Sequence, residues 1–355
     1  MRWFWRIFFT LVLLAGWALL GYFYVDFTLG SPKRTQPVEV EIPENSSIQQ
    51  IGKILKEKRL IRESYFFRYY VQMKGKTDLR AGYYEILPDE SLDDILAKLS
   101  SGDENTVKVV IPEGKNARQI AEILEKAGFD KAGFLDMLNN KKPKYNFETE
   151  IPKHPERPYR LEGYLFPSTY YFRKDETPEN IVNKMLEEFA KRMENLEVRD
   201  KLANNKVPGG MTVDKWVTIA SLVEREGQVK AEFPKIAGVI YNRLNSNQYP
   251  KLQIDATIVY IYSMKGQKVM PTQKMTKLEH PYNTYHIKGL PPGPIGCPGE
   301  DALKAALEPT KHNYYFYVTK EDGSGEHYFA SDYQQHQKYI NMSRENRSKR
   351  QASGD

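Results

Sequence analysis

The sequence predicts an α+β protein with a single N-terminal transmembrane helix, a set of strand–helix repeats, and then a second domain of mixed α+β structure. Three observations lead to this prediction. Residues 7–25 carry no charged side chain, one strand–turn–helix pattern recurs three times between residues 42 and 124, and amphipathic helices followed by a β-hairpin occupy the region after residue 160. At 355 residues the chain has the length of about two domains.

The composition excludes several classes of function. Lys and Arg total 52 against 46 Asp and Glu, a net charge of +6 that is too small and too dispersed for a nucleic-acid-binding protein. Cys297 is the single cysteine, so the chain can form neither an internal disulfide nor a cysteine-based metal site. The six histidines include no closely spaced ligand pair. We therefore expect no metal and no cofactor.

The charge-free segment 7–25 predicts a membrane anchor, because its 19 residues are enough to cross a hydrocarbon core of about 30 Å. Arg2 and Arg6 precede it, and the positive-inside rule then places residues 1–6 in the cytoplasm and the rest outside. A cleaved signal peptide is the alternative, but no small-x-small cleavage site ends the segment. We expect a single-pass protein of the cell inner (cytoplasmic) membrane with an extracytoplasmic or periplasmic C-terminal domain. Residues 26–37 are rich in turn formers and predict a short tether.

A repeated pattern follows the tether. Residues 42–55, 86–99 and 111–124 each read as a short β segment, a proline-containing turn, a polar cap and a helix with apolar residues at i, i+3 and i+4. This unit resembles the LysM-like module, a small glycan-associated fold. We expect a LysM-like region over residues 38–140. Glycan binding by these copies stays open, because a fold does not determine a function.

Prolines in residues 141–160 interrupt regular structure and predict a linker. After it, apolar stripes predict three helices, which begin at Pro178, Val213 and Pro234.

A β-hairpin is predicted next, from residues 314–319 and 327–329. The last segment, residues 343–355, carries basic side chains without apolar support. We expect it to be a disordered tail.

Carboxylates are the remaining candidates for catalysis, since the chain contains neither G-x-S-x-G nor S-x-x-K. Glu224 and Glu226 both fall within the apolar arc of the helix that begins at Val213, about 160° apart. A carboxylate on a buried face needs a partner or a raised pKa, and a raised pKa is what a general acid requires. Periodicity alone does not decide between an acid and an ion pair. Two carboxylates that point apart cannot flank one glycosidic bond.

The motif Ala220-Ser221-Leu222-Val223-Glu224-Arg225-Glu226 resembles the A-S-[IL]-[VI]-E-x-E signature of the YceG-like family, the endolytic murein transglycosylases. Further segments resemble motifs of that family in the same order: 161–170 (LEGYLFPSTY), 239–244 (VIYNRL), 252–260 (LQIDATIVY), 282–285 (YNTY), 289–295 (GLPPGPI), and His327 with His336. Ser168, Ile254 and Ala256 depart from the usual pattern. Such ordered motifs are far more specific than a single one.

The resemblance implies a lyase, with residues 161–342 as its catalytic domain. It would be a lytic transglycosylase that cleaves MurNAc–GlcNAc β-1,4 bonds in nascent peptidoglycan strands, leaves 1,6-anhydroMurNAc ends and terminates strand elongation beside the peptidoglycan synthases (penicillin-binding proteins). In this interpretation Glu224 is catalytic and Glu226 has a lesser role. The other candidates for substrate binding are Glu162, Tyr164, Ser221, Glu226, Asn242, Arg243, Gln253, Asp255, Asn283, Tyr285 and His327. Two alternatives stay open: a non-catalytic LysM-type peptidoglycan-binding scaffold of the wall-synthesis machinery, and a hydrolase.

Overall fold

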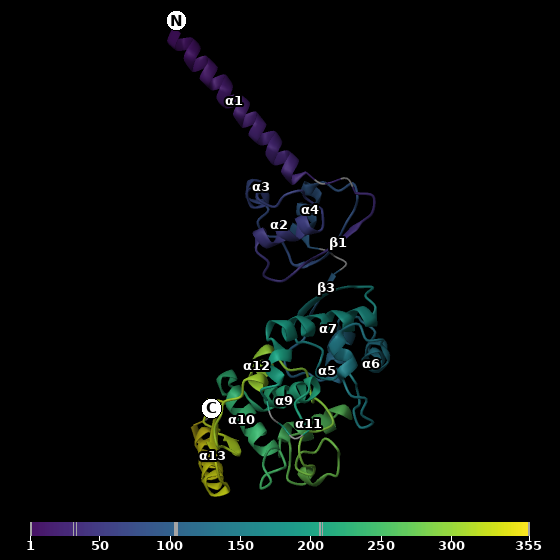
Figure 1. Ribbon diagram of the computed structural model, residues 1–355, viewed down its shortest axis with the longest axis vertical. Helices are drawn as coiled ribbons and strands as arrows, with labels where there is room; N and C mark the ends of the chain where they lie inside the picture. The colour runs from purple at the N-terminus through teal and green to yellow at the C-terminus, as the bar shows by residue number, and fades with distance from the viewer. Residues whose placement is uncertain are drawn as a thin grey trace. The chain divides into compact units, whose positions relative to one another are not determined.

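The computed structural model describes residues 2–30, 32, 34–102, 106–205, 207 and 209–353, and it divides the chain into two compact units (Figure 1). Unit 1 comprises Met1–Val109 with Thr169–Asp175, and unit 2 comprises Val110–Ser168 with Glu176–Asp355. The expected boundary after residue 140 is therefore displaced. The division falls directly before the third repeat, and this places the helix of that repeat in unit 2.

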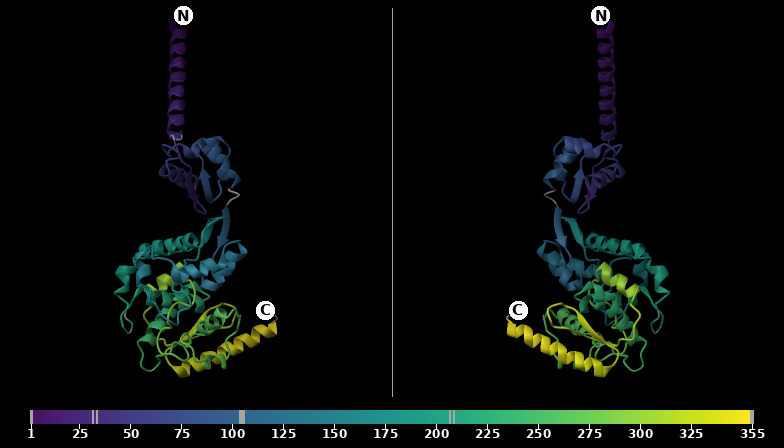
Figure 2. Two further views of the ribbon diagram at one scale, coloured as in Figure 1. Left: turned by 90° about the vertical axis from the view of Figure 1, so that its right-hand side faces the viewer. Right: turned by 90° about the vertical axis from the view of Figure 1, so that its left-hand side faces the viewer.

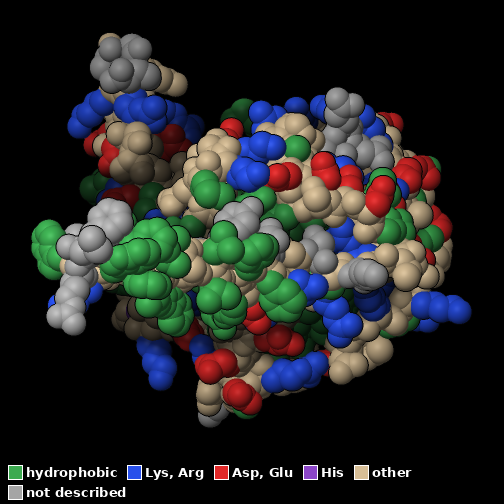
Figure 3. Space-filling model, turned by 90° about the horizontal axis from the view of Figure 1, so that it is seen from above, with side chains coloured by type: hydrophobic (Ala, Val, Ile, Leu, Met, Phe, Trp, Pro, Cys, Tyr) green, Lys and Arg blue, Asp and Glu red, His purple; other side chains and the backbone are tan. Residues whose placement is uncertain are grey.

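Unit 1 begins with a long apolar helix, α1 (Arg2–Leu29). Within it, Phe8–Leu29 is long and apolar enough to cross a membrane, judged by length and composition. Most of its described large hydrophobic side chains before Thr28 are exposed, and the view from above shows hydrophobic side chains gathered on this face (Figure 3). The helix continues into the segment expected to be a tether, because Thr28 and Leu29 are buried against the rest of unit 1. Residues 31 and 33 of that segment lie outside the described residues.

The rest of unit 1 is a small α+β body. Its elements are β1 (Val38–Ile42), α2 (Ile48–Glu57), α3 (Phe67–Met73), β2 (Gly82–Ile86), α4 (Leu92–Ser101), β3 (Thr106–Val110) and β4 (Thr169–Arg173). β1 and β2 pair antiparallel, with Val38 opposite Ile86, and β3 pairs with β4. The core is formed by aliphatic and aromatic side chains of the two helix–strand repeats, among them Val40, Leu55, Ile86 and Leu96.

The three repeats share one local device at the start of their helices. A polar residue accepts a hydrogen bond from the backbone N–H three residues on, and the side chain at that position reaches back to the cap, which satisfies two otherwise unpaired donors. The pairs are Ser47 with Gln50 in α2, Ser91 with Asp94 in α4, and Asn116 with Gln119 in α5 (Ala117–Lys126). The predicted strand–turn–helix pattern is confirmed as secondary structure, and its LysM-like identity stays a prediction.

Unit 2 is mostly helical. Besides α5 it contains α6 (Lys131–Asn140), η1 (Asn146–Glu150), α7 (Pro178–Asn195), α8 (Val198–Leu202), α9 (Val213–Glu226), η2 (Lys230–Glu232), α10 (Phe233–Leu244), α11 (Asp255–Met264), η3 (Met275–Lys277), α12 (Glu300–Leu307), β5 (Phe316–Thr319), β6 (His327–Ala330) and α13 (Tyr333–Ser353). The helices predicted to begin at Pro178, Val213 and Pro234 are α7, α9 and α10. β5 and β6 form the predicted antiparallel hairpin, with Thr319 opposite His327.

The core of unit 2 surrounds α9. Ten of its fourteen residues are buried, and it packs against α10, α11 and α12. Trp216 is fully buried, and its indole N–H donates to the carbonyl oxygen of Leu303 at 2.9 Å. Burial stops at Val223, so Glu224 and Glu226 emerge from the core at the C-terminal end of the helix.

Two segments differ from the sequence interpretation. The expected linker, residues 141–160, is anchored in unit 2 by several buried residues, and the fully buried side chains of Lys141 and Glu148 form an ion pair at 2.7 Å. The expected disordered tail, residues 343–355, lies almost entirely in α13, which runs beside the β5–β6 hairpin (Figures 1 and 2). Arg347 pairs with Glu321 of the hairpin turn at 2.9 Å, so tertiary contacts order a helix that has no apolar stripe.

Candidate active site

Glu224 and Glu226 lie two residues apart on α9 and, as their spacing predicts, reach different surroundings. Both are half-buried. Glu224 contacts backbone loops at the start of α12, whereas Glu226 borders a cavity lined by α10, α11, the β5–β6 hairpin and α13.

Glu224 is held by a single hydrogen bond. The backbone N–H of Gly299, the N-terminal cap of α12, donates to its Oε2 atom at 3.0 Å, and this is its one hydrogen-bond partner among the described residues. The other carboxylate oxygen accepts no hydrogen bond from the part of the chain that the structure describes. The N-terminus of a helix carries a partial positive charge, so this bond holds the carboxylate without a neutralising ion pair.

The turn of the third repeat closes one side of the Glu224 site. Gly114 donates its N–H to the carbonyl oxygen of Cys297, and Cys297 donates to that of Lys115, both at 2.8 Å. Gly114 has a φ of +73°, and a Cβ atom there would lie 3.6 Å from the Cγ atom of Glu224. A Cβ atom on Gly299 would collide with the carboxyl group of Glu113. The two loops therefore form a close-fitting wall around Glu224.

Three charged side chains border this site. Lys230 forms ion pairs with Glu113 at 3.1 Å and with Asp301 at 2.8 Å. Burial raises the pKa of Glu224, and the negative charges of Glu113 and Asp301 raise it further, while the Gly299 N–H and Lys230 oppose them. The net result is a raised pKa, as a proton donor requires.

Glu113 and Asp301 were not identified as site residues from the sequence. Glu113 belongs to the third copy of the repeated pattern, and that pattern does not indicate that it lies near Glu224.

Glu226 has both carboxylate oxygens bonded. The Tyr317 hydroxyl donates to Oε2 at 2.9 Å, and the backbone N–H of Ala256 donates to Oε1 at 3.3 Å. Burial raises the pKa of Glu226 to about 7. These bonds connect α9 to α11 and to β5.

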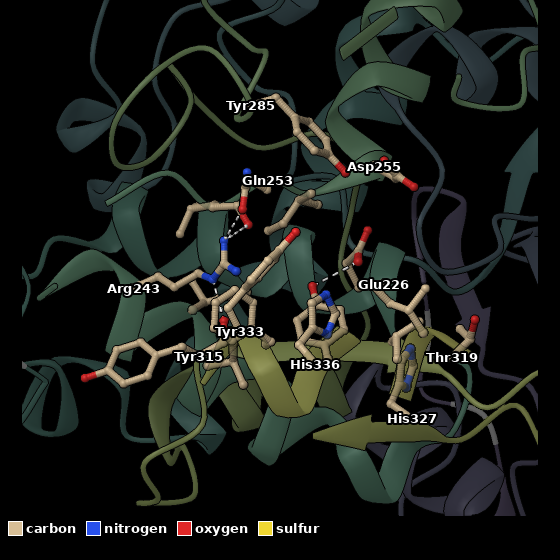
Figure 4. Close-up of a pocket in the computed structure, with 18 of the residues that line it drawn as sticks. Glu226, Arg243, Gln253, Asp255, Tyr285, Tyr315, Thr319, His327, Tyr333 and His336 are labelled. Carbon is tan, nitrogen blue, oxygen red and sulfur yellow. Dashed lines mark hydrogen bonds between the residues drawn. The ribbon is translucent and has the colours of Figure 1, made fainter. Parts of the chain in front are cut away.

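The cavity beside Glu226 has a volume of about 540 Å³ and brings together five further predicted residues, Arg243, Gln253, Asp255, Tyr285 and His327 (Figure 4). The Arg243 guanidinium donates to the Gln253 side chain at 3.0 Å, and the Tyr285 hydroxyl donates to Asp255 at 2.7 Å. His327 lies 2.8 Å from the carboxylate of Glu232 through its Nδ1 atom. His336 also lines the cavity.

Five predicted residues lie outside that cavity and have structural contacts. Glu162 is fully buried, accepts the backbone N–H of Ala117 at 3.0 Å at the start of α5, and receives a bond from the Tyr260 hydroxyl. Burial raises the pKa of Glu162 to about 8. Tyr164 is also fully buried, and its hydroxyl donates to Asp214 at 2.8 Å. Both side chains are buried and make structural contacts, and their role in substrate binding stays a prediction.

Ser221, Asn242 and Asn283 connect loops to helices. The Ser221 hydroxyl accepts the backbone N–H of Ile295 at 3.1 Å, which attaches the 289–299 loop to α9. The side-chain amides of Asn242 and Asn283 each donate to two backbone carbonyl oxygens. Within the described part of the chain, no group of three or more His, Cys, Asp or Glu side chains is arranged to hold a metal ion.

The protein has a mixed α+β fold with two acidic side chains at the end of a buried helix. Comparison with known proteins identifies the class of protein to which it belongs. Residues 40–342 match the model of the YceG-like family, so the chain belongs to that family. Over 327 aligned residues it is 33% identical to the endolytic murein transglycosylase of Bacillus subtilis strain 168, covering 87% of this chain and 86% of the relative.

Two more relatives agree. The endolytic murein transglycosylase of Streptococcus pneumoniae strain R6 is 32% identical over 93% of this chain, which spans 63% of the length of that relative. The crystal structure of a yceG-like protein from Listeria monocytogenes matches with a TM-score of 0.56 and 32% identity, over 85% of this chain and 98% of the other.

Proposed function

We propose that this protein is a membrane-anchored endolytic lytic transglycosylase that cleaves the β-1,4 bond between MurNAc and GlcNAc in peptidoglycan, with Glu224 as its acid and base. The observation that carries the proposal is the state of Glu224: a half-buried carboxyl with a raised pKa, of which one oxygen accepts a hydrogen bond from the described part of the chain. The names of the Bacillus and Streptococcus relatives support the same reaction.

The reaction needs one carboxyl group. Glu224 first protonates the oxygen that links MurNAc C1 to the next GlcNAc, and the C1–O bond breaks. The C6 hydroxyl of the same MurNAc then attacks C1, and the Glu224 carboxylate takes the hydroxyl proton. The product is a 1,6-anhydro ring, and no water is consumed. An attacking group within the same sugar has an effective molarity on the order of 10⁵ M or more, which removes the need for a second carboxylate.

Glu226 is the competing candidate, because its pKa is about 7 and it borders the cavity. Both of its oxygens already accept hydrogen bonds from Tyr317 and Ala256. These two bonds fix the carboxyl group between α11 and β5, whereas Glu224 has a single bond among the described residues, so we assign Glu226 a positioning role.

The setting of the reaction follows from α1. We place Phe8–Leu29 in the inner (cytoplasmic) membrane with both units outside the cytoplasm, because Arg2 and Arg6 precede the span. An anchor of this kind would hold the active site near the membrane, where nascent strands emerge beside the peptidoglycan synthases. The repeats of unit 1 would serve as a LysM-like region, with or without glycan binding.

Mass analysis of products from purified peptidoglycan tests the reaction. A lytic transglycosylase leaves 1,6-anhydroMurNAc ends that are lighter by one water, about 18 Da, than hydrolysed ends. Reducing MurNAc ends would instead establish a hydrolase. No product from a folded protein would favour the peptidoglycan-binding scaffold.

A further inference from the structure

A stripe of large side chains on unit 1 faces solvent. Tyr65, Tyr69 and Met73 are 71%, 69% and 73% exposed, and their four-residue spacing places them along the outer face of α3 and the turn before it. The opposite face of the same helix is fully buried through Phe67 and Val71. Large exposed side chains aligned along one face of a helix mark an interaction site more often than scattered exposed residues do. We call Tyr65, Tyr69 and Met73 the α3 stripe.

The α3 stripe belongs to a segment that packs directly on the end of α1. The backbone N–H of Glu63 donates to the carbonyl oxygen of Thr28 at 2.9 Å, and the guanidinium of Arg62 donates to that of Phe27 at 2.8 Å. The rings of Tyr24 and Phe66 meet edge to face, with centroids 6.2 Å apart. Figure 1 shows α3 beside the end of α1. These bonds leave little freedom between the last turn of α1 and α3.

The same segment is strongly basic. Residues 56–76 contain seven Lys and Arg and two Asp and Glu, a net charge of +5. Arg59 and Arg68 are exposed, and the Arg62 guanidinium lies 4.2 Å above the Phe27 ring. Aromatic and basic side chains together are typical of surfaces at the boundary between hydrocarbon and water, where tyrosine rings lie at headgroup depth and long basic side chains reach the phosphates.

We propose that the α3 stripe rests in the outer boundary of the same bilayer that α1 crosses, with the surrounding basic side chains against anionic lipid headgroups. The proposal goes beyond the reaction and rests only on the membrane anchor. The apolar span ends at Leu29, so the residues that the turn before α3 contacts, from Tyr24 to Thr28, lie where the helix leaves the hydrocarbon. A glycan strand could use aromatic side chains on any face of unit 1, whereas only a lipid surface requires them beside the anchor.

The consequence concerns orientation. With α1 and the α3 stripe both in the membrane, unit 1 is attached by two points and cannot turn freely about the anchor. The basic side chains would make this attachment stronger on an anionic surface.

A lipid-quenching experiment on the full chain in vesicles tests the proposal. An environment-sensitive fluorophore is attached to Gln72→Cys, an exposed position on α3 that leaves the stripe intact. Cys297 is buried and does not compete for the label. The matched control is Gln49→Cys, exposed in the first turn of α2, whereas the contacts with α1 come from residues that follow that helix. Vesicles contain phosphatidylcholine with or without phosphatidylglycerol, and carry a spin-labelled lipid.

We expect quenching at position 72 to exceed that at position 49 by about twofold or more, to increase with phosphatidylglycerol, and to fall to the control level in a Tyr69→Ser/Met73→Ser background. Equal quenching at the two positions in vesicles that retain the protein would overturn the proposal and leave the anchor intact. Protein that does not float with vesicles would overturn both. Protection of position 72 by added glycan strands, without lipid quenching, would identify a glycan as the occupant and also overturn it.

Discussion

Glu224 and Glu226 lie on two sides of α9 and have different environments. Glu224 meets backbone groups of two loops and accepts one hydrogen bond, from Gly299. Glu226 meets the side chain of Tyr317 and the backbone of Ala256, and both of its oxygens accept a bond. Burial raises the pKa of each carboxyl. A raised pKa is therefore common to both carboxyls, and the number of oxygens that accept a hydrogen bond is the feature on which we propose Glu224 as the acid.

The two environments are formed by different segments of the chain. The Glu224 wall combines the turn of the third repeat with the 289–299 loop, two segments more than 170 residues apart in the sequence. The Glu226 surroundings come from α11 and the β5–β6 hairpin. One helix thus separates a tight backbone-lined site from an open cavity of about 540 Å³.

The largest expected effect comes from replacing each of the two glutamates, one at a time, with glutamine. Glu224→Gln keeps the volume but cannot donate and regain a proton, so we expect product formation to fall by about 10²-fold to 10⁴-fold. Glu226→Gln should retain partial activity. Rates of anhydroMurNAc release measure both, with circular dichroism as the control for folding. An inactive Glu226→Gln beside an active Glu224→Gln would reverse the assignment.

Much of the fold was predictable from local patterns. Thr177 and Pro178 start α7, Thr212 caps α9, and the apolar stripes of these helices are buried as their periodicity indicates. α13 could not be predicted, because its contacts with the hairpin are non-local and its sequence has no apolar face. The segment 141–160 differs from its prediction for a related reason: prolines do interrupt its secondary structure, but they do not prevent the burial of Lys141 and Glu148.

The candidate site was predictable only in part. The position of Glu224 follows from the family motif and the helix period, whereas the approach of Glu113 depends on tertiary packing between distant loops. Likewise Glu162 and Tyr164 stand in a motif that resembles the family, yet burial gives them structural contacts. A motif therefore indicates that a residue matters and leaves open whether it contacts substrate.

Glu162 offers a reference for a fully buried carboxyl group whose hydrogen bonds connect α5 and α11. Its folded pKa of about 8 lies above the ordinary Glu value of 4.5, so the folded state binds the proton more tightly. Stability is then fully present below pH 4.5 and decreases as the pH rises toward 8. We expect Glu162→Gln to remove this loss, making the protein more stable at pH 9 than the parent by a few kcal/mol. Thermal unfolding at pH 5 and pH 9 measures it, and an unchanged pH dependence would contradict the assignment.

The charge of Glu113 should affect the pH dependence of activity through the pKa of Glu224. Its negative charge helps keep Glu224 protonated, so Glu113→Gln should lower the pKa of Glu224 and move the alkaline limb of activity to lower pH by roughly half a pH unit. Lys230→Gln is the matched variant with the opposite sign, because Lys230 lowers that pKa. Profiles of initial rate against pH measure both shifts. Shifts in the same direction, or none, would show that these charges do not act on the catalytic proton.

The smallest effect on activity should come from a substitution beside Glu226, on the other side of α9. Tyr317→Phe removes the hydroxyl that bonds to Glu226, and this bond favours the ionised carboxylate. The pKa of Glu226 should therefore rise further above about 7. We expect a stability loss of about 1 kcal/mol at pH 8, where Glu226 is ionised, and less at pH 5, where it is protonated. Activity should stay near that of the parent. Unfolding at the two pH values and an NMR titration of the Glu226 carboxyl measure these effects, and a loss of activity as large as that of Glu224→Gln would place the catalytic proton on Glu226.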